Sequence, residues 1–246
     1  MKKNGFTLAE ILITMSIVGV VSALTIPSLV SSYKKDVWGT SLAKAVNAFS
    51  NACSMMIIKD GADGIFDTKA WVEIENGGGI NSVTKHLGKS LTITETGNGN
   101  DFYSGLNVRM KTTTTTNISN KFGDYPYYKT KNNITYLFRP ITLGTDQFHE
   151  ELDMVAGDLI IDVNGKDSPN IFGRDIFGFL LNNDGRLIPY GDTESLHITD
   201  KVKTSSLGDT SRVTDNWKTS CSNAVANNGG PTCTAKVVNE GYKINY

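Results

Sequence analysis

The N-terminus carries the feature that most constrains the fold, a long apolar run. Lys2 and Lys3 precede it, and residues 6–30 contain one charged side chain, Glu10. An apolar stretch of about 20 residues is long enough to cross a bilayer as a helix. A carboxylate at the centre of a membrane helix costs about 2.5–3.5 kcal/mol and usually has a partner. We therefore expect a membrane helix in which Glu10 serves a function.

A secretory signal peptide explains this segment less well than a membrane helix does. Signal peptides have an apolar core of about 7–15 residues, followed by a small-residue cleavage site. Ser22-Ala23-Leu24 resembles such a site weakly, but the apolar run continues to Val30. The glycine at the polar–apolar junction, Gly5, precedes the core instead of following it. An uncleaved signal anchor is the remaining alternative.

Gly5-Phe6-Thr7-Leu8-Ala9-Glu10, followed by an apolar helix, resembles the leader junction of type IV pilins and type II secretion pseudopilins. The resemblance implies that residues 1–5 form a leader, that prepilin peptidase cuts between Gly5 and Phe6, and that the same enzyme methylates the new amine of Phe6. Glu10 matches the family's glutamate, and Pro27 stands where many members carry a helix-loosening proline. The match covers only the N-terminal segment, but cut site, glutamate and proline agree in spacing.

The implied cleavage would give Glu10 a partner, because it creates a cationic amine on Phe6. In a helical filament, the Phe6 amine of one subunit would lie against the Glu10 carboxylate of a neighbour. Charges about 4 Å apart attract by about 4 kcal/mol at an effective dielectric constant of about 20, although desolvation offsets much of this gain. We therefore expect Glu10 to set axial register during assembly. In the alternative, Glu10 extends to the headgroups from its place near the helix end.

Pro27 and Gly19 interrupt the regularity of the apolar segment. A proline within a helix removes one backbone hydrogen bond and collides with the preceding turn. The helix could therefore kink or melt locally when it leaves the lipid for a filament. An ordinary membrane kink is the alternative, since both residue types are frequent in membrane helices.

Beyond the membrane segment the helix is expected to continue with one apolar face. Apolar residues recur at steps of three and four, the pattern of an amphipathic helix, and Gly61-Ala62-Asp63-Gly64 ends it. A helix from Phe6 to about Asp60 would be about 80 Å long. Residues 6–30 would form the membrane or filament-core half, and residues 31–60 would pack beneath a head. The stripe comprises Trp38, Leu42, Ala45, Val46, Phe49, Ala52, Cys53, Met56 and Ile57.

Residues 61–246 are numerous enough for one core and predict a β-rich head. Asn183-Asp184-Gly185 predicts a hairpin, because Asp-Gly supplies the positive φ of a tight turn. An antiparallel sheet packed on the long helix gives an α+β fold, which is also the pilin architecture. Glycine- and threonine-rich stretches within residues 88–130 are expected to be surface loops or one mobile insertion. The predicted strands are Ile134–Leu143, Asp158–Val163, Ile176–Leu181, Arg186–Tyr190 and Ala235–Ile244.

The chain has three cysteines, which cannot all pair within one molecule. The export that the N-terminal motif implies permits disulfides, and many type IV pilins close a C-terminal loop with one. The resemblance thus favours a Cys221–Cys233 bridge, with Cys53 as a buried thiol; a bridge from Cys53 to either of the others stays open. Neither the cysteines nor the histidines show the spacing of zinc ligands.

An Asp-rich segment begins at Asp162 and is similar to one common in bacterial pilin-like proteins. Asp162, Asn164, Asp167 and Asp175 are hard oxygen donors of the kind that Ca²⁺ prefers. Some secretion pseudopilins bind calcium in C-terminal loops, so the resemblance supports Ca²⁺ as a cofactor. The spacing differs from that of an EF-hand loop. Asx-turns and caps are the alternative explanation.

Catalytic motifs are missing from the sequence, and we expect no enzyme. It contains no Gly-x-Ser-x-Gly elbow, no Walker-type phosphate loop and no His-Glu-x-x-His. A net charge of −1 argues against general nucleic-acid binding. Lysines interleaved with Tyr125, Tyr127 and Tyr128 predict a solvated loop in preference to a DNA-binding patch.

The expected function is a structural filament subunit. It would wait in the bacterial inner membrane as a single-pass protein, with its head in the periplasm or outside, until an assembly platform moves it into a helical fibre of similar subunits. The fibre is a type II secretion pseudopilus or a type IV pilus, and the large head favours a minor subunit. One alternative is a binding module, a tip adhesin or DNA-uptake pilin with an exposed patch near Tyr125–Tyr128. Another is a membrane-anchored periplasmic enzyme.

Overall fold

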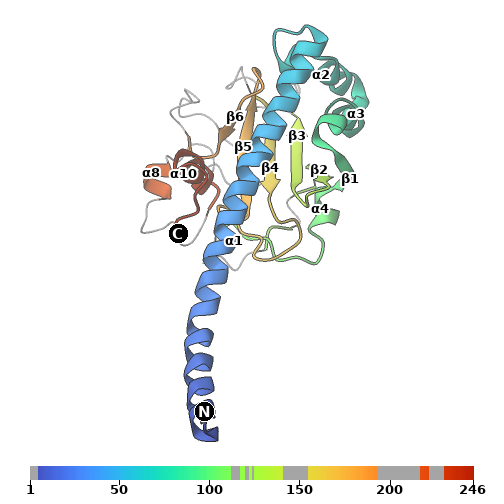
Figure 1. The fold of residues 1–246 in the computed structure, drawn as a ribbon. Helices are drawn as coiled ribbons and strands as arrows, with labels where there is room; N and C mark the ends of the chain where they lie inside the picture. The colour runs from blue at the N-terminus through green and yellow to red at the C-terminus, as the bar shows by residue number, and fades with distance from the viewer. Residues whose placement is uncertain are drawn as a thin grey trace.

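A long helix and a β-rich head make up the chain, as the predicted α+β architecture required (Figure 1). In Figure 1 the head packs against the C-terminal half of helix α1 (Leu8–Asp60), and the N-terminal half projects from it. The computed structural model describes residues 5–111, 117–119, 122–123, 125–140, 155–192, 217–221 and 230–246.

Helix α1 ends where the sequence predicted. Gly61 adopts the left-handed conformation (φ 64°, ψ 31°), and its N–H bonds to the carbonyls of the preceding turn. The predicted stripe faces the head: most of its members are buried, and Trp38, Val46 and Ile57 are partly buried against the core. The helix passes through Pro27 without interruption.

Gly39 belongs to the buried face although the apolar pattern did not include it. A Cβ atom at this position would lie 2.0 Å from the backbone oxygen of Tyr242. The C-terminal segment therefore crosses α1 at a point where only a hydrogen fits.

We expect Gly39→Ala to lower the free energy of unfolding of the head by about 1–3 kcal/mol, because the added methyl group forces the C-terminal segment away from α1. Gly19→Ala is the matched control, since a Cβ there meets no atom within 4 Å and the gain in helix propensity is the same. Urea unfolding of the full chain in detergent measures both. Equal midpoints for the two variants would contradict the close contact.

Within the described residues, six antiparallel strands form one sheet in which each strand pairs with the next along the chain. The β5–β6 hairpin turns through Gly185 (φ 84°), whose N–H donates to the Asn182 carbonyl at 2.9 Å, as the Asp-Gly signal predicted. The strands are β1 (Ile93–Asn98), β2 (Pro126–Thr130), β3 (Thr135–Pro140), β4 (Val155–Asp162), β5 (Ile176–Asn182) and β6 (Leu187–Pro189).

Both faces of this sheet are covered, and every residue of β4 and β5 is buried. On the α1 face, Phe138 packs between Phe49 and Trp71, with ring centroids 5.5 Å and 5.9 Å away. A second apolar cluster, which includes Phe102 and Phe122, covers the opposite face. The sheet is thus the middle layer of the head.

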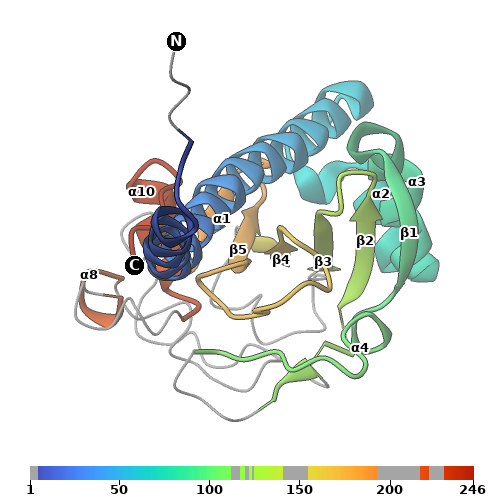
Figure 2. The same cartoon turned by 60° about the horizontal axis from the view of Figure 1, so that its bottom comes forward.

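Short helices cover the edges and ends of the sheet. In Figure 2, α2 and α3 lie on the β1 side, and α10 lies beside α1 on the β5 side. The helical conformation is interrupted between α2 and α3 at Gly77, where φ is 90°. The helical elements of the head are η1 (Ile65–Asp67), α2 (Lys69–Glu73), η2 (Ile74–Gly78), α3 (Gly79–Leu91), α4 (Gly99–Phe102), α8 (Trp217–Ser220) and α10 (Cys233–Asn239).

Two predictions about the secondary structure of the head were wrong. Residues 88–130 are not one mobile insertion: they supply β1, α4 and β2, and their aromatic side chains build the second cluster. The segment Ala235–Ile244 is not a strand, because Cys233–Asn239 forms α10. A short apolar run does not distinguish helix from strand, and packing against β5 and β6 decides it here. Thr112–Thr116 and residues 141–143 lie outside the described residues.

Candidate functional site

The N-terminus of α1 is the candidate site, and a reciprocal set of hydrogen bonds organises it. Thr7 is extended (φ −77°, ψ 153°), and its hydroxyl accepts a hydrogen bond from the backbone N–H of Glu10 at 3.2 Å. The Glu10 carboxylate in turn accepts from the backbone N–H of Thr7 at 2.8 Å and from the Thr7 hydroxyl at 2.9 Å. This arrangement is a capping box.

The capping box gives the Glu10 carboxylate a partner within its own chain. Two donors from Thr7 reduce the cost of holding that carboxylate near hydrocarbon, and the negative charge favours the helix N-terminus. Thr7 was not among the predicted site residues. The signal was present, since Thr-x-x-Glu ahead of an apolar run is typical of a capping box.

Gly5 and Phe6 lie on exposed chain ahead of the helix. The Phe6 side chain is 84% exposed, and a Cβ at Gly5 would meet no atom within 4 Å. Because the first helical residue is Leu8, a peptidase can reach the Gly5–Phe6 bond without unwinding α1.

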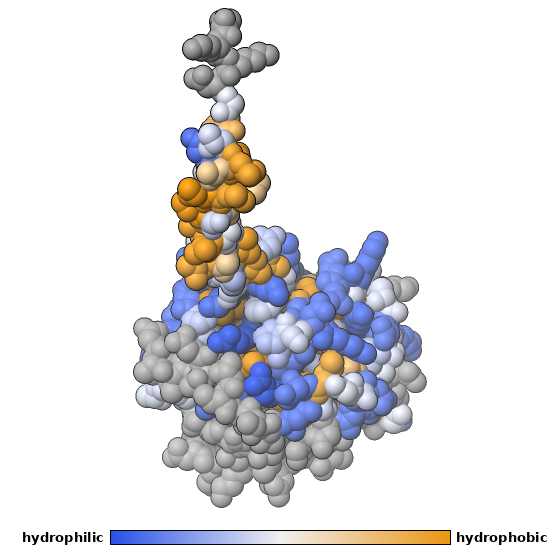
Figure 3. Space-filling model, turned by 90° about the horizontal axis from the view of Figure 1, so that it is seen from below, coloured by the Kyte–Doolittle hydropathy of each residue, from blue (hydrophilic) through white to orange (hydrophobic). Residues whose placement is uncertain are grey.

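The half of α1 outside the head is apolar and exposed along its length. Figure 3 shows it as a largely hydrophobic rod that leaves a mostly hydrophilic face of the head. The helix is long and apolar enough to cross a membrane. Its large apolar side chains from Phe6 to Val30 are exposed in the described part of the chain. Such a surface is stable in lipid or in a bundle of like helices, because water disfavours apolar area of this extent.

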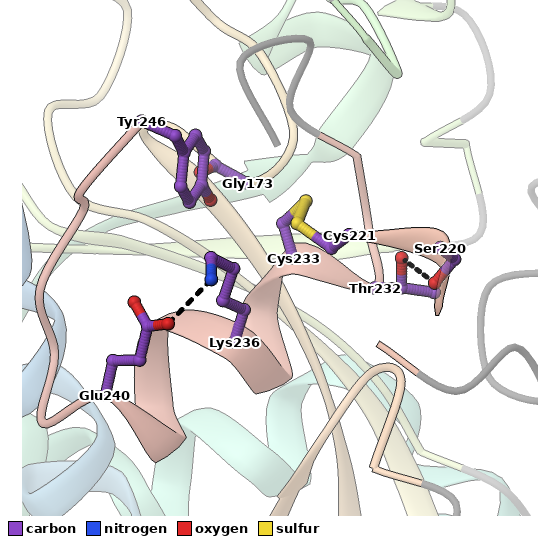
Figure 4. The surroundings of a disulfide bond; sticks show 8 residues. All are labelled: Gly173, Ser220, Cys221, Thr232, Cys233, Lys236, Glu240 and Tyr246. Carbon is purple, nitrogen blue, oxygen red and sulfur yellow. Dashed lines mark hydrogen bonds and ion pairs between the residues drawn. A yellow bond between two sulfur atoms is a disulfide. The ribbon is translucent and has the colours of Figure 1, made fainter. Parts of the chain in front are cut away.

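A disulfide between Cys221 and Cys233 joins α8 to α10, with the Cα atoms 5.2 Å apart (Figure 4). This is the bridge that the resemblance favoured. Cys53 is a free thiol on the buried face of α1, and burial raises its pKa to about 12. Cys53 is therefore protonated and poorly reactive at neutral pH.

The surroundings of the disulfide fasten the C-terminus to the rest of the head. Figure 4 shows Lys236 on α10 paired with Glu240 at 2.6 Å. The Tyr246 hydroxyl donates to the carbonyl of Gly173, in the connection between β4 and β5. The disulfide-closed C-terminal corner, made up of α8, α10 and residues 240–246, is thus attached to the β4–β5 connection.

The Asp-rich segment forms the β4–β5 connection, residues 163–175, and its carboxylates hold the backbone in place. Asp162 accepts hydrogen bonds from the N–H of Gly165 at 2.7 Å and from the Tyr103 hydroxyl at 2.8 Å. Asp175 accepts from the N–H of Asn170 and from that of the next residue, both at 2.8 Å. These are the turn contacts that the sequence offered as the alternative to metal ligation.

The structure brings together only part of the predicted calcium set. Asp162 and Asp175 are buried and interact electrostatically, whereas Asp167 is exposed. The Asn164 amide donates to the backbone oxygen of Asp167 at 2.9 Å. In the described part of the chain, no three His, Cys, Asp or Glu side chains are grouped as metal ligands. Calcium binding at these four residues stays a prediction.

Burial changes the acidity of both buried carboxylates. It raises the pKa of Asp175 to about 6, although backbone N–H donors partly oppose this effect. Burial, together with the charge of Asp175, raises the pKa of Asp162 well above its ordinary value. Between about pH 4 and pH 6 the folded protein therefore binds more protons at Asp175 than the unfolded chain does.

Because of this difference, Asp175 makes the protein less stable as the pH rises from about 4 through 6, by about 3 kcal/mol at most. We expect Asp175→Asn to lower the free energy of unfolding at pH 4.5, because an amide has one acceptor oxygen where the carboxyl group has two. At pH 7.5 the loss should be smaller or absent, because the substitution also removes a buried negative charge. Urea midpoints of both proteins at the two pH values measure the difference. A parallel shift of the midpoint at both pH values would contradict the raised pKa.

The tyrosines of the predicted solvated loop are buried, two of them in β2 and Tyr125 directly before it. Tyr125, Tyr127 and Tyr128 are at most 8% exposed. The hydroxyls of Tyr125 and Tyr190 donate to the buried Asp158 carboxylate. The prediction of a solvated loop at these tyrosines was therefore wrong, and they form no exposed aromatic patch.

Residues 1–26 match the family model of the prokaryotic N-terminal methylation motif, the signature of type IV pilins and pseudopilins. This match confirms the resemblance that the leader junction suggested, and proteins with this motif are structural. Comparisons with curated proteins and with solved structures gave no match.

Proposed function

We propose that the chain is a non-enzymatic filament subunit. Prepilin peptidase removes its leader, and the mature subunit is then assembled into a type II secretion pseudopilus or a type IV pilus. The observation that carries the proposal is the N-terminal motif on an exposed junction, directly ahead of an exposed apolar helix. A motif of this kind on a buried or folded segment could not be processed.

Assembly would exchange the partner of Glu10. Before assembly, its carboxylate bonds to Thr7 of the same chain. After cleavage, the Phe6 amine of a neighbouring subunit offers a full positive charge, and charge-assisted hydrogen bonds are stronger than neutral ones. The capping box thus holds Glu10 in a defined rotamer until that amine arrives.

The proposed topology has the leader on the cytoplasmic side and the head in the periplasm or outside. The N-terminal motif supports it, whereas the positive-inside rule favours neither side, because Lys2 and Lys3 precede the apolar run and Lys34 and Lys35 follow it. From the membrane an inner-membrane assembly platform would move the subunit into a fibre. The partners are then prepilin peptidase, the platform and other pilin or pseudopilin subunits.

A minor subunit is the better assignment within the filament. The head carries an additional layer over the second face of its sheet, beyond what a compact, abundant subunit requires. The disulfide-closed C-terminal corner favours a pilus, and the Asp-rich connection favours secretion. The tip-adhesin alternative loses its main support, because the tyrosines on which it depended are buried.

Mass spectrometry of the N-terminus tests the processing step directly. In cells with active prepilin peptidase, we expect a chain that begins at Phe6 and carries one added methyl group. Gly5→Val should leave the leader attached, because the side chain obstructs the cut, whereas Gly19→Val, which lies within α1 and away from the cut site, should be processed normally. An intact Met1 on the unmodified chain would contradict the proposal.

A further inference from the structure

We propose that the base of the head binds the headgroups of anionic phospholipids while the subunit waits in the membrane. This inference rests on the proposed membrane-anchored function and adds the lipid class. The base is the surface around α1 where the helix leaves the head. It comprises Lys34 and Lys35 of α1, the β4–β5 connection and the C-terminal segment 242–246.

Contacts already described join the parts of the base. The Tyr242 backbone lies against Gly39 of α1, and Tyr246 bonds to Gly173 of the β4–β5 connection. In Figure 1 the C-terminus lies at the end of the head from which the apolar half of α1 projects. Figure 2, which turns this end forward, shows the β4–β5 connection there as well. The base therefore faces the membrane whenever α1 spans it.

The spacing along α1 places the first lysines among the headgroups. The headgroup layer on each side of the hydrocarbon core is about 5–7 Å thick. The apolar run ends at Val30, and Lys34 follows about 6 Å farther along the helix axis. Tyr33 lies at the same level and is 68% exposed, and tyrosine favours such interfacial positions.

Four lysines and Arg174 give the base its positive charge, although the whole chain carries a net charge of −1. Lys34, Lys166 and Lys243 are exposed, and Lys35 and Arg174 are partly exposed. Among the described residues, none of the four lysines forms an ion pair. The exposed acids of the same segments are Asp36 and Asp167. In Figure 3, hydrophilic residues surround the point where the apolar helix leaves the head.

Anionic phospholipids fit this surface better than zwitterionic ones. A lysine near an anionic membrane surface gains enough attraction for about a fivefold preference, and the attraction falls off within a Debye length. The Lys166 ammonium lies 5.1 Å from the centre of the Phe102 ring. This contact holds Lys166 against the head, so less side-chain freedom is lost when it meets a phosphate.

The test uses the full chain in phosphatidylcholine vesicles that contain a trace of spin-labelled phosphatidylglycerol or spin-labelled phosphatidylcholine. Electron paramagnetic resonance measures how strongly each labelled lipid associates with the protein. We expect the protein to select phosphatidylglycerol severalfold at low salt. The selectivity should disappear at about 1 M salt, where the Debye length is about 3 Å.

Paired variants separate the head from the helix. Lys166→Gln with Lys243→Gln should reduce the selectivity, because both side chains belong to the base of the head. Lys59→Gln with Lys69→Gln removes the same charge near the opposite end of α1 and should leave the selectivity unchanged. Unfolding midpoints measured in parallel show that each variant is folded.

Four outcomes would overturn the proposal. The first is no selectivity in the unmodified chain. The second is equal loss in the two paired variants, which would indicate a response to net charge alone. A third paired variant, Lys34→Gln with Lys35→Gln, gives the third outcome: loss of selectivity in this variant alone would assign the lipid contact to the helix and not to the head. Crosslinking between copies, measured in the same vesicles, gives the fourth: a change in the Lys166/Lys243 variant without a change in lipid selectivity would indicate a protein partner. A chain that fails to float with vesicles would instead contradict the membrane-anchored function itself.

Discussion

A subunit with Glu10→Gln should stay in the membrane, lose its leader normally and be absent from filaments. Glutamine has nearly the same shape as glutamate, and its amide oxygen can still accept from Thr7. It has no charge, however, to pair with the Phe6 amine of a neighbour. Removing one partner of a buried ion pair costs about 3–5 kcal/mol, which lowers incorporation by about 100-fold or more.

The measurement compares the amounts of subunit in sheared filaments and in membranes. Thr7→Val is the matched control, because it removes the hydroxyl of the capping box and keeps the Glu10 charge. Loss of a helix cap costs about 1 kcal/mol, so this variant should still enter filaments, in reduced amount. Normal incorporation of Glu10→Gln would refute the charge-pair role. Complete exclusion of Thr7→Val would show that the cap, and not the charge, controls assembly.

Removing the disulfide by Cys221→Ser with Cys233→Ser should lower the free energy of unfolding of the head by about 3 kcal/mol. The two cysteines are 12 residues apart, and closing a loop of that size restricts the unfolded chain by about this amount. The loss should affect a large region, because α10 also anchors to the sheet: the N–H of Ala235 donates to the Tyr190 carbonyl at 3.1 Å.

Urea unfolding of the full chain in detergent provides the measurement, and Cys53→Ala is the control for loss of a cysteine as such. Thiol titration gives an independent check. The unfolded, unreduced protein should expose one thiol, and the reduced protein three. A double serine variant as stable as the unmodified chain would contradict the stabilising role, and three thiols without reductant would contradict the bridge.

The N-terminal helix was predictable because its signals are local. The methylation motif and the end of α1 at Gly61 each depend on residues close together in the sequence. Thr7 belongs to the same class, and its role follows from the spacing to Glu10 alone. The hairpin at Gly185 was also predictable, since a tight turn is specified by its own residues.

The rest of the head depends on contacts between residues far apart in sequence. Gly39 is constrained by Tyr242, and no sequence neighbour of Gly39 indicates that contact. Phe102 and Phe122 lie in stretches whose glycines and threonines suggested loops, and they become buried only because the second face of the sheet needs a cover. The α10 helix contains valines that favour strands, but the disulfide and the contacts with β5 select a helix.

The contact between Gly39 and Tyr242 has a mechanical consequence. Residues 242–246 contact α1 at one end and Gly173 of the β4–β5 connection at the other, so a pull along the helix axis is transmitted to that connection and through it to the sheet. From Gly39 onward, α1 and the head would then move as one rigid body. Any bending between a membrane-embedded stem and the head must occur in residues 31–38, which sets the length of the hinge available to a flexing fibre.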